Sequence, residues 1–251
     1  MTAVPADTER GKGGSASIGV DDYWWYRVRA RLLETILRPY VGDADTVLDV
    51  GSADGPSVGW LRGRRTHVTL DLDPRGLTVG EGVNGSALAL PFATGAFDVV
   101  GAFDVLEHCE PEGVAVAEFA RVLRPGGRLL LSVPAYQWAW SDFDVQNGHH
   151  RRYTRPRAVA AVEAGGLEVL RVSHAFASTF PLFAAERLVR RAKLAVRSGD
   201  AVEAADIVPL PPTPEPLARV LTGLGLLDER ILRRRDLPFG SSVVLVARKP
   251  V

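Results

Sequence analysis

The sequence VLDVGSADG, residues 47–55, joins a short apolar run to a turn with a glycine at either end. A continuous apolar run of this length is typical of a parallel strand that is covered on both faces. The two glycines would let a ligand approach the backbone of the turn closely. Two carboxylates, Asp49 and Asp54, lie where they would repel a bound phosphate. The turn should therefore hold a ligand that tolerates or requires negative charge.

Strand and helix patterns alternate along the chain, which predicts βαβ units and a mainly parallel sheet. The residues expected to form strands are 45–50, 66–74, 97–103, 128–134, 167–175 and 241–250. Helices are expected at about 22–38, with Asp21 or Asp22 as N-cap, at about 56–61, from 111 until Pro125-Gly126-Gly127, and at about 180–197. The turns that follow parallel strands lie along one edge of such a sheet, where ligands bind.

The composition fits one domain without a charge bias. The chain has 251 residues, 46% of them apolar, and 30 basic against 30 acidic side chains, so we expect no nucleic-acid partner. A single cysteine, Cys109, no secretion signal and no apolar run of about 18 residues favour the cytoplasm. We expect residues 1–20 to be a disordered lead-in. Residues 21–251 should form one domain, with 176–239 as a cap or insertion between the last two strands.

The turn fits neither common phosphate-binding pattern. A G-x-G-x-x-G fingerprint would need a glycine at Ala53, and the Gly-Lys-Ser/Thr of a Walker loop is absent. A ligand with a cationic amino group and a sulfonium fits better, because Asp49 would attract it. Asp71 ends the next strand at the distance, about 20 residues, at which an acid binds ribose hydroxyls. In a plainer interpretation, Asp49 caps the following helix and Asp71 only ends a strand before Pro74.

Four motifs follow one another in this order: VLDVGSADG, VTLDLDP, ALPFATGAFDVVGAFDVLEH and RVLRPGGRLLLSVP. Together they resemble the class I S-adenosylmethionine-dependent methyltransferases with a type 11-like methyltransferase domain, from about residue 24 to residue 166. The resemblance implies an α/β, Rossmann-like fold with a mainly parallel seven-stranded sheet, helices on both faces and a helical cap. Its antiparallel C-terminal edge hairpin would be formed by residues 167–175 and 241–250.

The resemblance also implies that S-adenosylmethionine is the cofactor and that S-adenosylhomocysteine is the product. Arg29 would pair with the methionine carboxylate, and Trp24 or Trp25 would cover the site. The implied cofactor-binding residues are Arg29, Asp49, Gly51, Ser52, Ala53, Asp54, Gly55, Asp71, Leu72, Ser86, Asp104 and Val105.

Within that set, Asp49 and the turn flank the methionine part, Asp71 binds the ribose and Leu72 packs on the adenine. Asp104 and Val105 line the floor beneath the sulfonium. Ser86 stands where the family often has an acid that binds the adenine amino group, so this chain departs from the pattern there.

Two segments after predicted strands carry candidate acceptor and catalytic residues. His108, in DVLEHCEPEG, titrates near neutrality and is a candidate base, although it could equally cap or pack at a helix start. The loop PAYQWAWSDFDVQNGHHRRYTR offers His149 or His150 as a base and two arginines for an anionic group. Its candidate acceptor-binding residues are Tyr136, Trp138, Trp140, Arg151, Arg152 and Tyr153.

The same loop has two other interpretations. Ion pairs between its aspartates and arginines could make it a support for the fold alone. A metal site from Asp142, Asp144, His149 and His150 is conceivable, but their spacing matches no known ligand pattern, so we expect no metal.

The helix expected at residues 181–197 is basic and amphipathic. Its apolar face comprises Leu182, Ala185, Val189, Ala192 and Val196, and its arginines outnumber its one glutamate. Such a helix can lie on an anionic membrane surface, which would suggest a lipid-linked acceptor. The commoner arrangement packs the apolar face on the domain and leaves the arginines in solvent.

The sequence therefore predicts an S-adenosylmethionine-dependent methyltransferase that modifies a small polar or lipid-linked acceptor by in-line displacement, with O-methylation favoured. It would be cytoplasmic, with peripheral contact to the inner membrane face as an option. The main alternative is a non-catalytic domain of the same fold that binds cofactor or a partner. A nucleotide-dependent oxidoreductase is disfavoured by Ala53.

Overall fold

The computed structural model describes residues 23–51, 55, 57–77, 82–196, 210 and 212–251, with the side chains of 193–196 left out. The expected lead-in, residues 1–20, therefore lies outside the described residues. So do the turn residues Ser52, Ala53 and Asp54.

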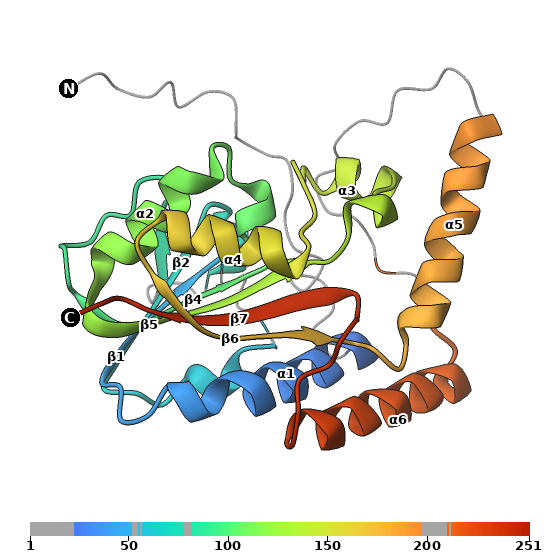
Figure 1. The fold of residues 1–251 in the computed structure, drawn as a ribbon, viewed down its shortest axis with the longest axis horizontal. Helices are drawn as coiled ribbons and strands as arrows, with labels where there is room; N and C mark the ends of the chain where they lie inside the picture. The colour runs from blue at the N-terminus through green and yellow to red at the C-terminus, as the bar shows by residue number, and fades with distance from the viewer. Residues whose placement is uncertain (1–22, 52–54, 56, 78–81, 197–209, 211) are drawn as a thin grey trace.

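Within the described residues, seven strands form one sheet in the order β3-β2-β1-β4-β5-β7-β6 (Figure 1). They are β1 (Thr46–Val50), β2 (Thr66–Asp71), β3 (Gly82–Asn84), β4 (Phe97–Phe103), β5 (Leu123–Pro134), β6 (Glu168–Ala175) and β7 (Ser242–Arg248). β1 to β5 pair in parallel, whereas β7 is antiparallel to both β5 and β6. The predicted fold class, including the antiparallel edge hairpin, is confirmed.

Helices cover both faces of the sheet (Figure 1). The α-helices are α1 (Trp24–Leu37), α2 (Glu112–Val122), α3 (Asp142–Gln146), α4 (Arg155–Ala164), α5 (Phe180–Val196) and α6 (Glu215–Leu232). Short 3₁₀ helices are η2 (Arg38–Tyr40), η3 (Gly59–Leu61), η4 (Pro74–Gly76), η5 (Leu106–His108) and η6 (Gln137–Ala139). One face carries α2 and α4, and the other carries α1 and α6.

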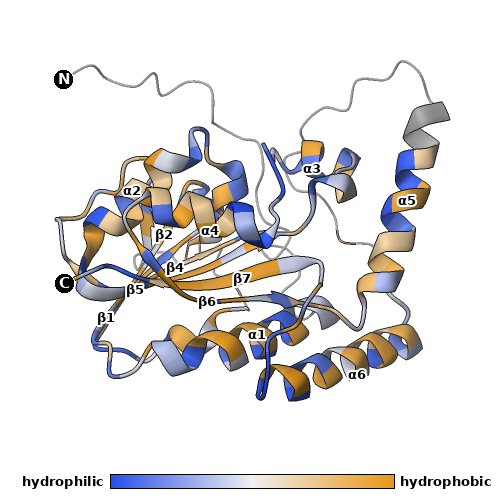
Figure 2. Ribbon diagram, in the orientation of Figure 1, coloured by the Kyte–Doolittle hydropathy of each residue, from blue (hydrophilic) through white to orange (hydrophobic). Residues whose placement is uncertain are grey.

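The apolar runs of the strands are explained by burial on both faces. In β7, Leu245 and Ala247 join the core beneath α2 and α4, while Val244 and Val246 join the core beside α1. Successive side chains of a strand point to opposite faces, so a strand between two helical layers is apolar at every position. Figure 2 shows β7 as a continuous apolar band between the layers.

Several predicted boundaries were wrong. The strand expected at 66–74 ends at Asp71, because Pro74–Gly76 form η4. The N-cap of α1 is Tyr23 rather than Asp21 or Asp22. The helix expected at 56–61 is the short η3, because the chain must return at once to the sheet. The helix expected to continue to Pro125 ends at Val122, because Leu123 already pairs with Phe97 of β4 and starts β5. The three-residue β3 was missed, since so short a strand leaves no periodic pattern.

Helix α5 exposes the face that was expected to be buried, because in the commoner arrangement the apolar face packs on the domain and the arginines lie in solvent. Leu182, Leu188 and Val189 are 56%, 57% and 54% exposed, whereas Arg187 is buried. The Arg187 guanidinium lies 5.1 Å from the ring centroids of both Phe143 and Phe183, and it donates a hydrogen bond to Ser141. Leu182, Leu188 and Val189 therefore face outward, whereas Phe183 packs on Arg187, and this arginine anchors the helix to α3.

Helix α6 packs closely against α1. A Cβ at Gly225 would lie 2.3 Å from Val28 Cγ1, and Arg31 donates to Glu229 at 2.7 Å. The extent of a cap over residues 176–239 stays a prediction. In the described part of the chain, no helix is long and apolar enough to cross a membrane.

Candidate cofactor and acceptor site

Three carboxylates lie at one edge of the sheet, at or just beyond the carboxyl ends of three adjacent strands. Asp49 is the penultimate residue of β1, Asp71 is the last residue of β2, and Asp104 follows β4 directly. The strand order reverses between β1 and β4, so Asp49 and Asp104 flank the switch point at which open α/β sheets bind ligands. The sequence predicted this grouping.

Gly51, which begins the turn after β1, occupies a place that only glycine fits well. Its φ is +67°, and an added Cβ would lie 2.4 Å from Cγ2 of Val105. Its N–H donates to Leu70 O at 2.7 Å, which holds the turn against β2. Gly55, at the far end of the turn, is buried. Gly51, predicted to flank the methionine part, thus lies close to Val105, predicted to line the floor beneath the sulfonium.

The end of β2 is built as a braced turn. Asp71 Oδ1 accepts a hydrogen bond from the N–H of Asp73 at 2.8 Å. The side-chain amide of Asn84 donates to Asp71 O at 3.0 Å and to Leu72 O at 2.9 Å. Leu72 is 49% exposed, as expected of an apolar side chain that packs on a ligand. Ser86 follows β3, and its Oγ accepts from the N–H of Leu88 at 3.1 Å.

Arg29 and Asp104 form an ion pair at the opening of this edge. Arg29 Nη2 lies 2.8 Å from Asp104 Oδ2 and 3.0 Å from Ser132 Oγ, and that hydroxyl donates to Asp104 Oδ1 at 3.1 Å. Trp25 lies beside the guanidinium at 5.3 Å and stacks on Phe176 at 5.6 Å. Arg29 thus reaches the ligand edge as predicted. Its contact with a methionine carboxylate stays a prediction.

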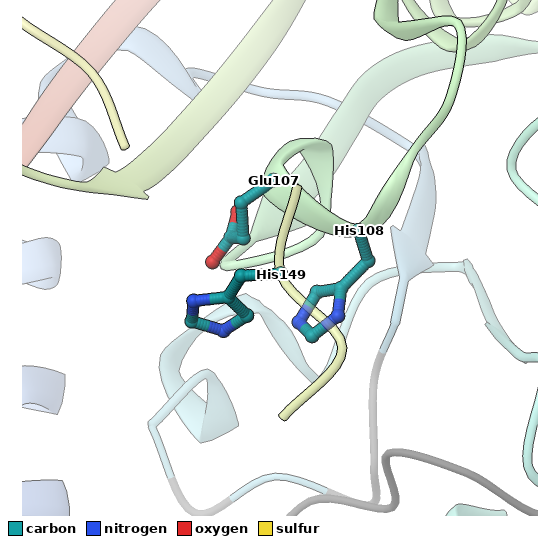
Figure 3. Close-up of side chains that lie close together, drawn as sticks. All are labelled: Glu107, His108 and His149. Atoms are coloured by element: carbon teal, nitrogen blue, oxygen red, sulfur yellow. The ribbon is translucent and has the colours of Figure 1, made fainter. Parts of the chain in front are cut away.

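Glu107, His108 and His149 converge in one cluster (Figure 3), and Asp104 is close enough to affect the pKa values of Glu107 and His108. One ligand atom from each residue lies within 4.8 Å of the others, and the two imidazole centroids are 4.6 Å apart. Burial, and then the charge of Asp104, raise the pKa of Glu107 well above its ordinary value. Part of His108 reaches solvent. Desolvation of its imidazole by the surrounding protein, and then the charge of His149, lower the pKa of His108 to about 3. His108 is therefore neutral at physiological pH.

Asp144 fixes His149 from the other side. His149 Nδ1 lies 2.9 Å from Asp144 Oδ1, which also accepts from Arg152 Nε at 2.6 Å. Burial alone would raise the pKa of Asp144, but the bonds to His149 and Arg152 outweigh it and lower that pKa. His150 has an exposed side chain, and its N–H donates to Glu107 O at 2.8 Å. This backbone bond joins the loop to η5.

The two arginines and the tyrosine of this loop serve as internal supports. Arg151 pairs with Glu110 and Glu112 and donates to Cys109 O at 2.9 Å. Arg152 is bound to Asp144, and Tyr153 is fully buried with its hydroxyl bonded to Glu112. The guanidinium groups of Arg151 and Arg152 are thus bound to internal partners and are not directed toward an anionic ligand. The assignment of these three side chains to an acceptor stays a prediction without support from the fold.

The aromatic residues of the loop form a surface pocket of about 520 Å³ beside α5. It is lined by Gln137, Trp138, Trp140, Ser141, Asp142, Val145 and Arg191. Arg191 donates to Trp138 O at 3.0 Å, so α5 forms one wall. Tyr136 stacks on Trp138 at 6.0 Å and on His174 at 5.5 Å. Two predicted acceptor residues, Trp138 and Trp140, therefore share one depression.

Sequence comparisons place the central strands in a known family. Residues 48–131 match the family described as a methyltransferase domain. An uncharacterized methyltransferase of Mycobacterium sp. (strain JLS) is 31% identical over 125 residues, 44% of this chain and 50% of that protein. A demethylmenaquinone methyltransferase of Mycolicibacterium vanbaalenii is 32% identical over 121 residues, 46% of this chain and 50% of that protein. The chain spans about half the length of these relatives.

Solved structures share the fold over most of the chain. The [4+2]-cyclase SpnF has a TM-score of 0.54 at 21% identity and covers 88% of this chain and 81% of its own. The N-methyltransferase NodS of Bradyrhizobium japonicum, in complex with S-adenosylhomocysteine, has a TM-score of 0.53 at 13% identity and covers 93% and 91%. At these identities the likeness shows the fold alone.

The family match and the sheet together establish the class. Residues 48–131 belong to a class I, S-adenosylmethionine-dependent methyltransferase domain, as the four motifs predicted. Two features of the site were not predicted from the sequence: Ser132, which binds both Arg29 and Asp104, and the approach of Glu107 to His149. Both join residues that are far apart in the chain, and only the fold brings them together.

Proposed function

We propose that the protein transfers the methyl group of S-adenosylmethionine, by in-line displacement, to an oxygen of a small polar or lipid-linked acceptor. The observation that carries this proposal is the row of Asp71, Asp49 and Asp104 along adjacent strand ends, around a turn that requires Gly51. Carboxylates in this position favour a ligand with hydroxyl donors and positive charge and disfavour a phosphate.

The residues of the edge fit S-adenosylmethionine in three respects. The Asp71 carboxylate, half-buried on a braced turn, suits the two ribose hydroxyls, and exposed Leu72 suits an adenine face. Asp49 is buried at the switch point, beside the close contact of Gly51 and Val105. When bound, the cofactor supplies a methyl carbon made electrophilic by a sulfonium. The chain itself supplies alignment, exclusion of water and a group that accepts a proton.

The acceptor is proposed to enter through the pocket of Trp138 and Trp140. These indoles offer a wide apolar contact with polar N–H groups, and Asp142 adds a carboxylate to the wall. Such a lining suits a partly apolar molecule with hydroxyl groups. It does not suit a polyanion, because Arg191 is the one cationic side chain among the described residues that line the pocket.

O-methylation is favoured because histidines lie next to Asp104. An acceptor hydroxyl must release a proton, and an imidazole is the side chain best matched to that task near neutral pH. His149 is bound to Asp144, and His108 is held neutral. The side chain of His150 is exposed, so it can pass a proton on to solvent. We assign the base to His150.

A lipid-linked acceptor is favoured by the outward apolar face of α5. Leu182, Leu188 and Val189 are exposed on the helix that also supplies Arg191 to the acceptor pocket. A helix with exposed apolar side chains and arginines can rest on an anionic membrane surface. An acceptor head group carried by that surface would then reach the pocket directly.

The first experiment is calorimetric titration of the full chain with S-adenosylhomocysteine. Wild type should bind in the micromolar range, and Asp71→Asn should bind at least about 10-fold more weakly because it loses a charged acceptor of hydroxyl hydrogen bonds. Asp73→Asn is the matched control, since Asp73 lies on the same turn but bonds to Arg75. A folded wild type that binds no S-adenosylhomocysteine would overturn the proposal.

The second experiment measures turnover as release of S-adenosylhomocysteine, with hydroxylated small molecules and a lipid-linked sugar as acceptors. His150→Gln should lower turnover by about 10²-fold while cofactor affinity is unchanged, as expected for loss of a general base. Equal turnover in this variant would remove His150 from the chemistry. Methylation of amine acceptors alone would contradict the O-methylation assignment.

A further inference from the structure

The convergence of Glu107, His108 and His149 is not explained by the methyl-transfer site alone. In the described part of the chain, these three form a group whose possible ligand atoms all lie within 4.8 Å of one another. Glu107 and His108 are fixed by η5 directly after β4, and His149 arrives from the loop after α3. The hydrogen bond from His150 N–H to Glu107 O joins the two segments, so the cluster has a defined backbone.

Glu107 is the member of the cluster that points most strongly to a cation as its partner. Its side chain is 1% exposed, and neither carboxylate oxygen accepts a hydrogen bond from another described residue. Arg29 bonds to Asp104 and Ser132, and Arg152 bonds to Asp144, so neither guanidinium donates a hydrogen bond to Glu107. Their charges act to lower the pKa of Glu107, but burial and Asp104 outweigh them. Buried carboxylates are normally paired or bound to a metal ion, and Glu107 lacks the pair. Its oxygens and the two imidazoles lie on the same side of η5 (Figure 3).

His149 is prepared as a ligand by its neighbour. Its Nδ1 lies 2.9 Å from Asp144 Oδ1, and a proton on Nδ1 leaves the lone pair of Nε2 available. Asp144 is fully buried and is held in turn by Arg152 and by the N–H of Ser141 at 2.9 Å. A carboxylate bonded to the remote nitrogen of a histidine is the usual second layer of a metal site, where it sets the tautomer and orients the ring.

The donor set selects the kind of metal. Two imidazole nitrogens and one carboxylate oxygen suit Zn²⁺ and neighbouring transition metals, whereas Mg²⁺ and Ca²⁺ prefer oxygen ligands throughout. Zn²⁺ sites with three protein ligands keep a fourth position for water or substrate. Donors bound at about 2.0–2.2 Å from one ion lie well within 4.8 Å of one another, the limit inside which the three ligand atoms already fall.

We propose that Glu107, His108 and His149 bind a divalent transition metal ion, with Zn²⁺ as the best fit. The ion lies next to Asp104, at the ligand edge of the sheet, and its open position takes an oxygen of the acceptor. It lowers the pKa of that hydroxyl, and the released proton passes to His150 or to water. This catalytic role rests on the proposed function, but the binding of the ion does not.

The test uses full-length, tag-free protein that has been treated with a chelator and then titrated with Zn²⁺ alone by calorimetry. Wild type should bind one ion per chain. Glu107→Gln and His149→Gln should each weaken binding by more than about 30-fold, because even outer partners of metal sites contribute 10–100-fold. His67→Gln, a histidine change on β2 away from the cluster, is the control and should bind as wild type does.

Replacement by Co²⁺ gives a readout that does not depend on activity. Visible absorption bands of a low-coordinate Co²⁺ ion should appear with wild type and be lost in His149→Gln. If Glu107→Gln does not fold, judged by circular dichroism, His108→Asn and His149→Gln carry the test. No Zn²⁺ binding by folded wild type, or equal binding by the folded variants, would overturn the metal site.

Titration of the same samples with S-adenosylhomocysteine separates the two proposals. Cofactor binding and methyl transfer that persist in metal-free protein would refute the catalytic role of the ion and leave the proposed function intact. Zn²⁺ binding in protein that fails to bind S-adenosylhomocysteine would support the metal site and refute the proposed function.

Discussion

Arg29 and Asp104 face each other across the ligand edge of the sheet, with Nη2 and Oδ2 2.8 Å apart. Arg29 comes from α1 and Asp104 from the end of β4, so the pair fastens the first helix over the switch point. Asp104 has a φ of +60°, an uncommon value for a residue other than glycine, and the bonds from Arg29 and Ser132 hold its side chain there. The two residues predicted to meet the cofactor therefore also fix each other.

Arg29→Met should weaken binding of S-adenosylhomocysteine by about 10-fold or more, because it removes a bidentate-capable cation and frees Asp104 to move. Arg31→Met is the matched control, since Arg31 lies on the same helix but bonds to Glu229 of α6. Calorimetric titration of both variants checks this. Equal affinities in Arg29→Met and wild type would show that the pair serves the fold alone.

Gly51→Ala should destabilise the protein by about 2–4 kcal/mol, because it adds both a strained φ and a Cβ in contact with Val105. Gly63→Ala separates the two effects. Gly63 has a φ of +81°, but apart from its chain neighbours no described residue has an atom within 4 Å of an added Cβ, so its cost should be about 1–2 kcal/mol. Urea unfolding of both variants measures the difference. Equal costs would mean that Val105 moves aside freely.

The sheet could be predicted because its strands are buried on both faces and so appear as uninterrupted apolar runs. The position of the cofactor site could then be predicted as well. Asp49, Asp71 and Asp104 are at or next to the carboxyl ends of strands, and parallel strands place these ends along one edge of the sheet. Ser132 could not be assigned, because its role depends on β5 lying next to β4.

Helix α5 shows where pattern reasoning fails. Amphipathicity indicates which face is apolar but not which face is buried, and the usual preference for apolar burial misplaced Arg187. Stacking of a guanidinium on Phe143 and Phe183, with a bond to Ser141, compensates for its burial. None of these partners lies near Arg187 in the sequence except Phe183, so the pattern carried no signal of them.

Asp98 should make the protein sensitive to acid. Burial raises the pKa of Asp98, but bonds from the N–H groups of Thr46 and Asp45, each at 2.9 Å, and nearby Arg124 outweigh it and lower that pKa. A carboxyl group whose pKa is lower in the folded state than in the unfolded state stabilises the fold at pH values above its unfolded pKa. For Asp98, this stabilisation is lost as the pH falls below about 4. At pH 7, Asp98→Asn should be less stable by about 1–3 kcal/mol. The gap should shrink in urea unfolding at pH 3, and a constant gap would contradict this account.

The exposed face of α5 predicts binding to anionic membranes. Vesicles that contain phosphatidylglycerol should sediment the wild-type protein, whereas neutral phosphatidylcholine vesicles should not, because the arginines of the helix add electrostatic attraction to apolar insertion. Leu188→Asp should reduce the sedimented fraction by about 10-fold, since the side chain is 57% exposed and its replacement puts a charge at the lipid surface. Val220→Asp is the matched control: Val220 is 59% exposed, but on α6, away from the acceptor pocket. Equal loss in both variants would indicate non-specific adsorption, and no sedimentation of wild type would leave a small free acceptor as the substrate.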